Sequence, residues 1–98
     1  MTFTLHLTHT AKESLKTLKH SPHLEKRYKA VAKTLHLLSQ NPRHPGLQTH
    51  KYHSLEGPDK EEIFEAYAEQ DTPSAYRVFF FYGPQRGEIT IFAITPHP

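Results

Sequence analysis

Two charged residues stand inside apolar segments of the sequence, and their types suggest chemistry on a phosphate. Glu65 lies within Ile63–Glu69, and Arg77 lies within Ala75–Tyr82. A charge removed from water must be paired or change its protonation state, so we expect an ion pair between these side chains. The pair can be purely structural. Alternatively, Glu65 orients the planar guanidinium of Arg77 as a bidentate clamp on a phosphate.

A histidine follows the last apolar segment of the chain. His97 stands between two prolines, directly after a predicted strand that ends at Thr95. A histidine in this position can act as a general acid or base at the edge of a sheet. The alternative is a frayed chain end without a chemical role.

A histidine-rich stretch in the middle of the chain mixes cations with an aromatic residue. The segment Arg43–His53 has the composition of surfaces that contact phosphates and stacked bases, with Arg43 and His50 as candidate RNA contacts. The alternative is a polar connection in which Leu47 and Tyr52 close the seam between helices and sheet.

The sequence predicts neither a metal site nor a cofactor. It has nine histidines and no cysteine, which excludes thiolate ligands. The pairs His20/His23 and His50/His53 have i, i+3 spacing, but no third ligand with a supporting carboxylate accompanies either pair. Glycine-rich phosphate loops, zinc-protease motifs and nucleophile elbows are also absent from the sequence.

The 98 residues form one predicted domain, residues 1–98, with an uneven charge distribution. Residues 1–53 hold nine Lys or Arg against two acids, whereas residues 54–98 hold three against eight. The basic half suggests a polyanionic partner, although solvated lysines on helices would give the same count.

Nothing in the chain predicts a membrane segment. The longest apolar run, Val78–Tyr82, is far shorter than the ~20 residues that cross a bilayer, and the first residues do not form a signal peptide. We expect a cytoplasmic protein.

The first half of the chain predicts a strand and two helices. Residues 2–8 alternate as a half-buried strand does, and Thr10 with Glu13 matches a capping box that opens a helix. A second helix is expected to begin at Ser21-Pro22 and to end near Gln40, before Asn41-Pro42.

The second half predicts a loop followed by three strands. We expect a loop from Asn41 to Lys60, with at most a short extended piece at Lys51–Leu55. The strands are Ile63–Glu69, Ala75–Tyr82 and Glu88–Thr95. The order β-α-α-β-β-β predicts an α+β domain, in which a helix hairpin covers one face of an antiparallel sheet.

Four short segments, in this order, resemble motifs of the RelE/ParE superfamily, the toxins of type II toxin–antitoxin systems. The segments are Asn41–Leu47, Ile63–Tyr67, Ala75–Phe79 and Ile94–His97.

The resemblance implies a toxin that is neutralised by a cognate antitoxin. RelE-like members cut mRNA on the ribosome without a metal, by attack of a 2′-hydroxyl on the adjacent phosphate. Arg77 matches the arginine that would clamp the phosphate, and His97 matches the histidine after the last strand. Lys51 and His53 would be further cations or proton carriers. Tyr67 stands where relatives have an arginine and would stack on a base.

Two other functions stay open at this point. ParE-like members of the superfamily inhibit DNA gyrase without cutting nucleic acid. The absence of lysines from Ile63–Glu69 and the exposed amphipathic helices favour such a protein target. A homologue that has lost toxicity would keep only its antitoxin-binding surface.

Overall fold

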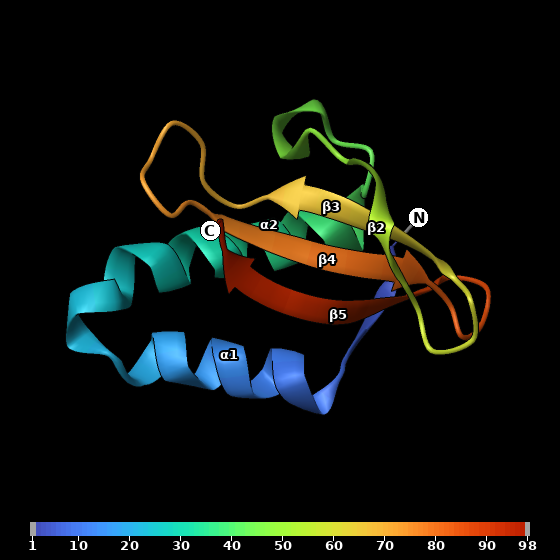
Figure 1. The fold of residues 1–98 in the computed structure, drawn as a ribbon, viewed down its shortest axis with the longest axis horizontal. Helices are drawn as coiled ribbons and strands as arrows, with labels where there is room; N and C mark the ends of the chain where they lie inside the picture. Colours follow the sequence, from blue (N-terminus) through green and yellow to red (C-terminus); the bar gives the residue numbers. More distant parts are fainter. Residues whose placement is uncertain (1, 98) are drawn as a thin grey trace.

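The computed structural model describes residues 2–97 and consists of a five-stranded sheet with two helices packed on one face. The helices are α1 (His9–His20) and α2 (Glu25–Gln40), joined by a 3-10 turn, η1 (Pro22–Leu24). A second 3-10 turn, η2 (Pro45–Leu47), follows α2. The strands are β1 (Thr4–Leu7), β2 (His50–Glu56), β3 (Glu62–Tyr67), β4 (Tyr76–Tyr82) and β5 (Glu88–Pro96) (Figure 1).

The α+β class and the helix hairpin are confirmed, but the sheet differs from the prediction in two details. Its order is β1-β5-β4-β3-β2, and β1 pairs with β5 in parallel, so the sheet is mixed. The segment expected to be mostly loop contains β2, which pairs with β3 at the sheet edge. Because almost every side chain of β2 is exposed, no hydrophobic alternation marks it as a strand.

The first helix is capped by Thr8, not by Thr10 as the capping-box pattern predicted. The Thr8 hydroxyl accepts a hydrogen bond from the Ala11 amide at 3.2 Å and donates one to the Phe92 carbonyl at 3.0 Å. Thr10 lies inside the helix and is exposed. Thr8 therefore joins the start of α1 to β5, which a local pattern cannot reveal.

Replacing Thr8 with alanine is expected to lower the free energy of unfolding by about 0.5–2 kcal/mol, as loss of an N-cap does. Thr10→Ala is the matched control and should change it by less than about 0.5 kcal/mol. Urea unfolding followed by circular dichroism measures both. A larger loss in Thr10→Ala than in Thr8→Ala would show that the cap lies at Thr10.

The second helix ends at Gln40, as predicted, but begins later than expected. The Ser21 hydroxyl donates to the Thr17 carbonyl at 2.7 Å and so does not cap a following turn. The chain instead passes through η1 before α2 begins at Glu25.

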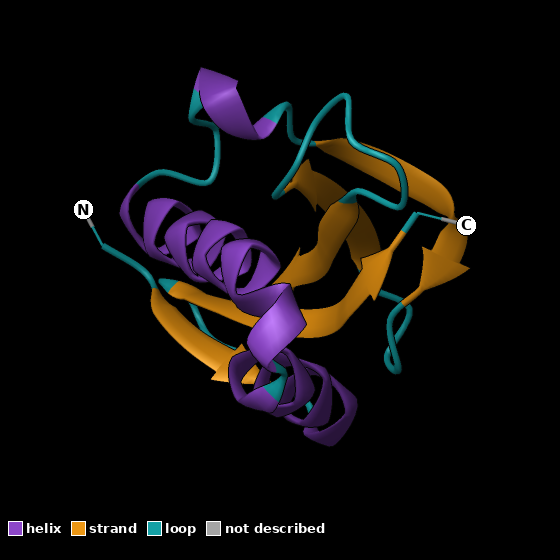
Figure 2. Ribbon diagram, turned by 90° about the vertical axis from the view of Figure 1, so that its left-hand side faces the viewer, coloured by secondary structure: helices purple, strands orange, loops and turns teal. Residues whose placement is uncertain are grey.

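The main core lies between the helices and the sheet. Both helices lie on one face of the sheet (Figure 2). The helix α1 packs on β5 and α2 packs on β4. Fully buried residues from all these elements meet in this layer, among them Leu18, Leu38, Val78, Phe80 and Ile91.

The face of the sheet that the helices leave uncovered has a small apolar cluster of its own. Ile63, Phe79 and Phe81 are buried there, with Tyr52 and Phe92 packed against them. An irregularity in the β4–β5 register inserts Phe92 as an extra residue opposite the Phe79/Phe80 step. Because both faces of the sheet bury apolar side chains, four consecutive residues of β4 are buried.

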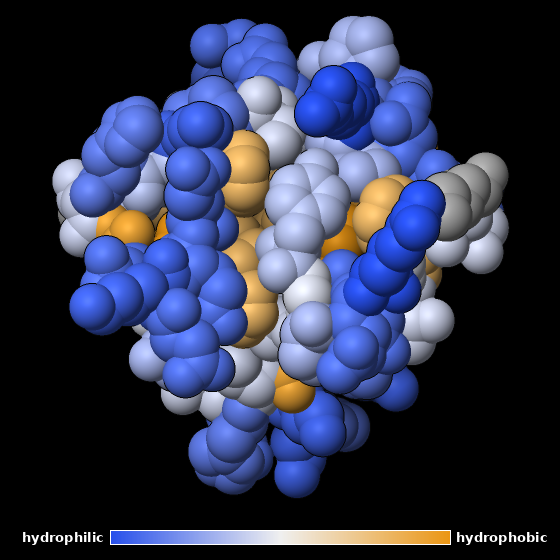
Figure 3. Space-filling view, turned by 90° about the vertical axis from the view of Figure 1, so that its right-hand side faces the viewer, coloured by the Kyte–Doolittle hydropathy of each residue, from blue (hydrophilic) through white to orange (hydrophobic). Residues whose placement is uncertain are grey.

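On the side of the molecule shown in Figure 3, apolar residues are visible in narrow strips between hydrophilic ones. Within residues 2–97, neither helix is long and apolar enough to cross a membrane.

Candidate functional site

The predicted ion pair between Glu65 and Arg77 is present on the uncovered face of the sheet. The β3–β4 register places Glu65 opposite Phe79 and Tyr67 opposite Arg77, so the two charged residues are diagonal neighbours. Arg77 Nη1 lies 2.6 Å from Glu65 Oε2. The Glu65 side chain is 3% exposed and that of Arg77 is 11% exposed. This is a buried pair, in which removal of either partner leaves an uncompensated charge.

A third residue, His50, completes a charged trio around Glu65. His50 lies opposite Glu65 in the β2–β3 register, and its Nε2 lies 2.8 Å from Glu65 Oε1. Its Nδ1 lies 2.9 Å from the Gln48 carbonyl oxygen. The ring therefore lies between two acceptor oxygens, and it donates to both of them when both nitrogens carry protons. In that form, Glu65 lies between two cations.

The guanidinium of Arg77 is fixed by aromatic rings as well as by Glu65. Its central carbon lies 4.9 Å from the Phe79 ring centroid and 5.9 Å from that of Tyr52. Its Nε is buried and meets no hydrogen-bond acceptor within residues 2–97. Arg77 is therefore held in one place, with donor capacity beyond that used by Glu65.

Arg77 opens into a groove of about 800 Å³, which we call the Arg77 groove. It is lined by Gln48, Tyr67, Arg77, His97 and the loop of residues 69–75. The structure thus brings together three predicted site residues that are distant in sequence. The His97 backbone amide donates to the Ala75 carbonyl at 2.8 Å, so the backbone of His97 is held to the start of β4.

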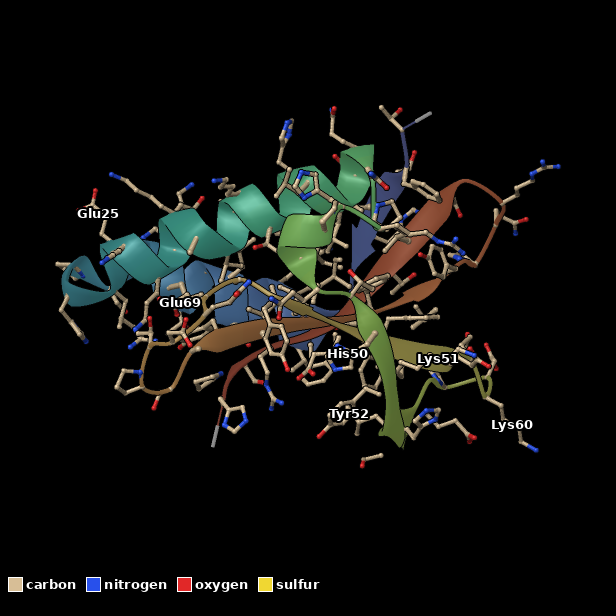
Figure 4. All side chains as sticks on the ribbon, turned by 90° about the horizontal axis from the view of Figure 1, so that it is seen from above. Glu25, His50, Lys51, Tyr52, Lys60 and Glu69 are labelled. Atoms are coloured by element: carbon tan, nitrogen blue, oxygen red, sulfur yellow. The ribbon has the colours of Figure 1, made fainter. Side chains whose placement is uncertain are left out.

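The other predicted cations lie away from the Arg77 groove. Lys51 is opposite Phe64 in the register and pairs with exposed Glu62 at 3.4 Å. His53 lies further along β2 and is exposed. Figure 4 shows His50 and Lys51 on the same stretch of β2. Arg43, exposed in the turn after α2, lies near Lys51 in a separate pocket.

Tyr67 is expected to remain neutral at physiological pH. Burial raises the pKa of its phenol above the ordinary value of 10, and the charge and hydrogen bonding of Glu65 act in the same direction, while Arg77 opposes them. A neutral phenol can donate a hydrogen bond or stack on a base, but it cannot serve as a ready general base. The Tyr67 ring also contacts that of His50, with centroids 5.7 Å apart.

Sequence reasoning missed Arg27, which holds the loop that forms one wall of the groove. Its Nη1 lies 3.0 Å from Glu69 Oε1, and the same guanidinium donates to the carbonyls of Ser74 and Pro73. Glu69 also accepts from the Tyr76 amide at 3.0 Å. These partners lie in a turn without any periodic pattern, so only the tertiary structure reveals the role of Arg27.

No group of three or more His, Asp or Glu side chains within residues 2–97 is placed to hold a metal ion.

Comparison with solved structures supports the fold assignment, whereas comparisons of sequence find no match. No family model and no curated protein sequence matches the chain. Among solved structures, the chain has the fold of RelE/ParE-like toxins, as predicted.

Three such structures superpose over nearly their whole length. A YoeB/ParE toxin from Agrobacterium tumefaciens has a TM-score of 0.71 at 8% identity, covering 98% of this chain and 100% of that chain. The archaeal RelE–RelB complex from Pyrococcus horikoshii OT3 has a TM-score of 0.65 at 19% identity, covering 98% of this chain and 96% of that chain. The YoeB dimer from Staphylococcus aureus gives 0.65 at 14% identity, covering 100% of both chains.

Proposed function

We propose that this protein is the toxin of a type II toxin–antitoxin system and that it cleaves mRNA on the ribosome. The observation that carries the proposal is the guanidinium of Arg77, fixed by buried Glu65 at the wall of an open groove that also contains His97. The toxin folds that superpose on the chain support the same class, and one of them was solved as a RelE–RelB complex.

The reaction we propose forms a bond between a 2′-oxygen and phosphorus and breaks the bond from phosphorus to the 5′-oxygen. Arg77 stabilises the negative charge that gathers on the phosphate oxygens in the transition state. The attacking 2′-hydroxyl loses a proton and the departing 5′-oxygen gains one; His97 transfers the proton at one of these oxygens, and water exchanges the other. Because the nucleophile belongs to the RNA itself, this reaction class needs no metal or cofactor.

Other predicted residues would bind RNA rather than take part in the bond changes. Tyr67 offers a neutral ring for a base inside the Arg77 groove. Lys51 and His53 on β2 would contact the RNA backbone outside the groove, with Arg43 in the preceding turn. His50 contacts the Glu65 oxygen that does not face Arg77, so its first role is to hold the Glu65 carboxylate in place.

We propose two partners on this basis. The first is a cognate antitoxin that covers the toxin, and the second is mRNA on the ribosome, which places the action in the cytoplasm. DNA gyrase is the alternative target.

Expression of the chain alone in a bacterial host, with growth and transcript ends both recorded, tests the proposal. We expect growth arrest with new cleavages inside translated codons, and no such cleavages in Arg77→Ala. Arrest with intact transcripts would contradict the nuclease and point to gyrase. Normal growth at verified soluble expression would instead indicate a homologue without toxicity.

Replacing His97 with alanine is expected to lower the cleavage rate by about 10²-fold, the lower end of the range for general acid–base catalysis. We choose this end because the side chain is exposed, so water can replace part of its function. Cleavage of a synthetic mRNA on purified ribosomes gives the rate. His36→Ala, which removes an exposed histidine on α2 outside the groove, is the control and should keep its rate within about threefold of the original protein. Equal loss in both variants would contradict the assignment of His97.

A further inference from the structure

A second hollow lies beside the Arg77 groove, and its charge is entirely of one kind. It has a volume of about 490 Å³, and we call it the Tyr82 pocket. It is lined by Arg43, His44, Pro45, Gln48, Thr49, His50, Lys51, Phe64 and Tyr82. No Asp or Glu is among these residues, whereas Glu69 and Asp71 line the Arg77 groove. The Tyr82 pocket is therefore suited to a negatively charged ligand.

The pocket also has a fixed aromatic surface. The Tyr82 side chain is one of the exposed large apolar groups of the described chain, at 40% exposure. Three rings hold it: Phe3 at 6.1 Å, Phe64 at 5.3 Å and Phe80 at 5.7 Å between centroids. A ring that is both exposed and immobilised can stack on a planar ligand at little cost in conformational entropy.

The cations around this ring are available to a ligand. Arg43 is exposed, and no carboxylate within residues 2–97 is close enough to form an ion pair with it. Lys51 has one partner, Glu62, but both side chains are more than half exposed, so a phosphate can replace that partner at little cost. His44 Nδ1 accepts from the Gly46 amide at 3.0 Å, which leaves the Nε2 proton of the neutral ring as a donor.

The two hollows are neighbours at the edge of the sheet formed by β2. Gln48 lines both of them, and His50 lines the Tyr82 pocket while it bonds Glu65 beside Arg77. A strand of nucleic acid whose phosphate lies at Arg77 would pass over His50, at the sheet edge, to reach the Tyr82 pocket.

We propose that the Tyr82 pocket is a second nucleotide subsite, in which a base of single-stranded RNA stacks on Tyr82 while a flanking phosphate lies between Arg43 and Lys51. The proposal rests on the proposed function, because it takes the same RNA strand. An acidic peptide would satisfy the cations equally well, but it would leave the exposed ring of Tyr82 without a planar partner. The combination of ring and cations therefore favours RNA.

Two synthetic RNAs separate this subsite from the Arg77 groove. One is a dinucleotide with a single phosphate, which is too short to occupy both hollows. The other is a hexanucleotide with 2′-O-methyl groups throughout, which cannot be cleaved through the 2′-oxygen. Titration of the isotope-labelled protein, followed by NMR, gives the dissociation constant of each RNA and the residues whose resonances move.

The variants Tyr82→Ala and Arg43→Glu should each weaken hexanucleotide binding by roughly five- to 100-fold, as the loss of one stacked base or of a phosphate contact does. Neither should change dinucleotide binding more than about twofold. Arg43 is exposed, so its variant keeps the test valid even if Tyr82→Ala loosens the aromatic cluster. Lys33→Glu, an exposed charge reversal on α2 outside both hollows, is the matched control and should alter neither RNA.

The outcomes distinguish the subsite from the proposed function. The subsite would be overturned if the hexanucleotide shifts the NMR resonances of Tyr67 and Arg77 and binds both variants with unchanged affinity. The nuclease proposal would then stand. Movement at Tyr82 and Arg43, with none at Arg77, would support the subsite and contradict the nuclease proposal. If a deca-glutamate peptide occupies the pocket and the hexanucleotide does not, the subsite is overturned in favour of a protein partner.

Discussion

Arg77→Ala is expected to lower the rate of mRNA cleavage by about 10²–10³-fold, the usual loss when a charge-stabilising donor is removed from the transition state. The reason is geometric, because Glu65, Phe79 and Tyr52 hold the guanidinium at one point of the groove wall. No other Arg or Lys lines the Arg77 groove within the described chain, so no neighbour can replace it. Single-turnover cleavage of a short mRNA on purified ribosomes measures the effect.

Two controls separate lost chemistry from lost structure. Arg77→Lys keeps the buried positive charge beside Glu65 but removes the planar fork, so we expect a folded protein that still loses at least about tenfold in rate. Lys33→Ala removes an exposed cation on α2, outside both hollows, and should change the rate by less than about threefold. Full activity in a folded Arg77→Ala protein would refute the role of Arg77 as the phosphate clamp.

Glu65→Ala is expected to lower the free energy of unfolding by about 3–5 kcal/mol, as loss of one partner from a buried ion pair does. The substitution leaves Arg77 and His50 facing each other without the carboxylate that now separates them. Unfolding in urea provides the measurement. The slope of the unfolding free energy against urea concentration should stay the same, which shows that unfolding remains two-state.

The exposed ion pair on β2 supplies the comparison for Glu65. Glu62→Ala removes a carboxylate that lies 3.4 Å from the Lys51 amine. Both side chains are more than half exposed, so we expect the free energy of unfolding to fall by less than about 1 kcal/mol. Glu65→Gln keeps the shape of the side chain and one hydrogen-bonding oxygen. Its loss in free energy of unfolding should therefore fall between those of Glu65→Ala and Glu62→Ala. If Glu65→Ala destabilises no more than Glu62→Ala does, the trio contributes little to the fold.

Much of the architecture could be predicted because local patterns specify it. The apolar spacing of α2 and the proline after Asn41 predict where that helix ends, and the apolar runs of β4 and β5 predict central strands. The strand β2 was predicted only as a short extended piece at Lys51–Leu55, because it is an edge strand whose side chains are mostly exposed. The parallel pairing of β1 and β5 is likewise a consequence of the crossover through the helices and leaves no local signal.

The candidate site also combines features that local sequence predicts with features that only the tertiary structure reveals. The Glu65–Arg77 pair could be predicted because two charges stood in apolar sequence. The position of His50 in the trio could not, since it depends on the β2–β3 register. Tyr82 was expected at the end of a strand, but the cationic pocket beside it could not be predicted, because the turn after α2 supplies Arg43 and His44.

The sheet separates two layers that can change independently during evolution. The larger cluster of buried apolar residues lies on the helix side, and the charged trio rests on a smaller apolar cluster on the other side. Mutations that remodel the outer surfaces of the helices can therefore accumulate without displacing the trio. Such a division allows the helix surfaces of this chain to change in sequence while the backbone that carries the Arg77 groove keeps its shape.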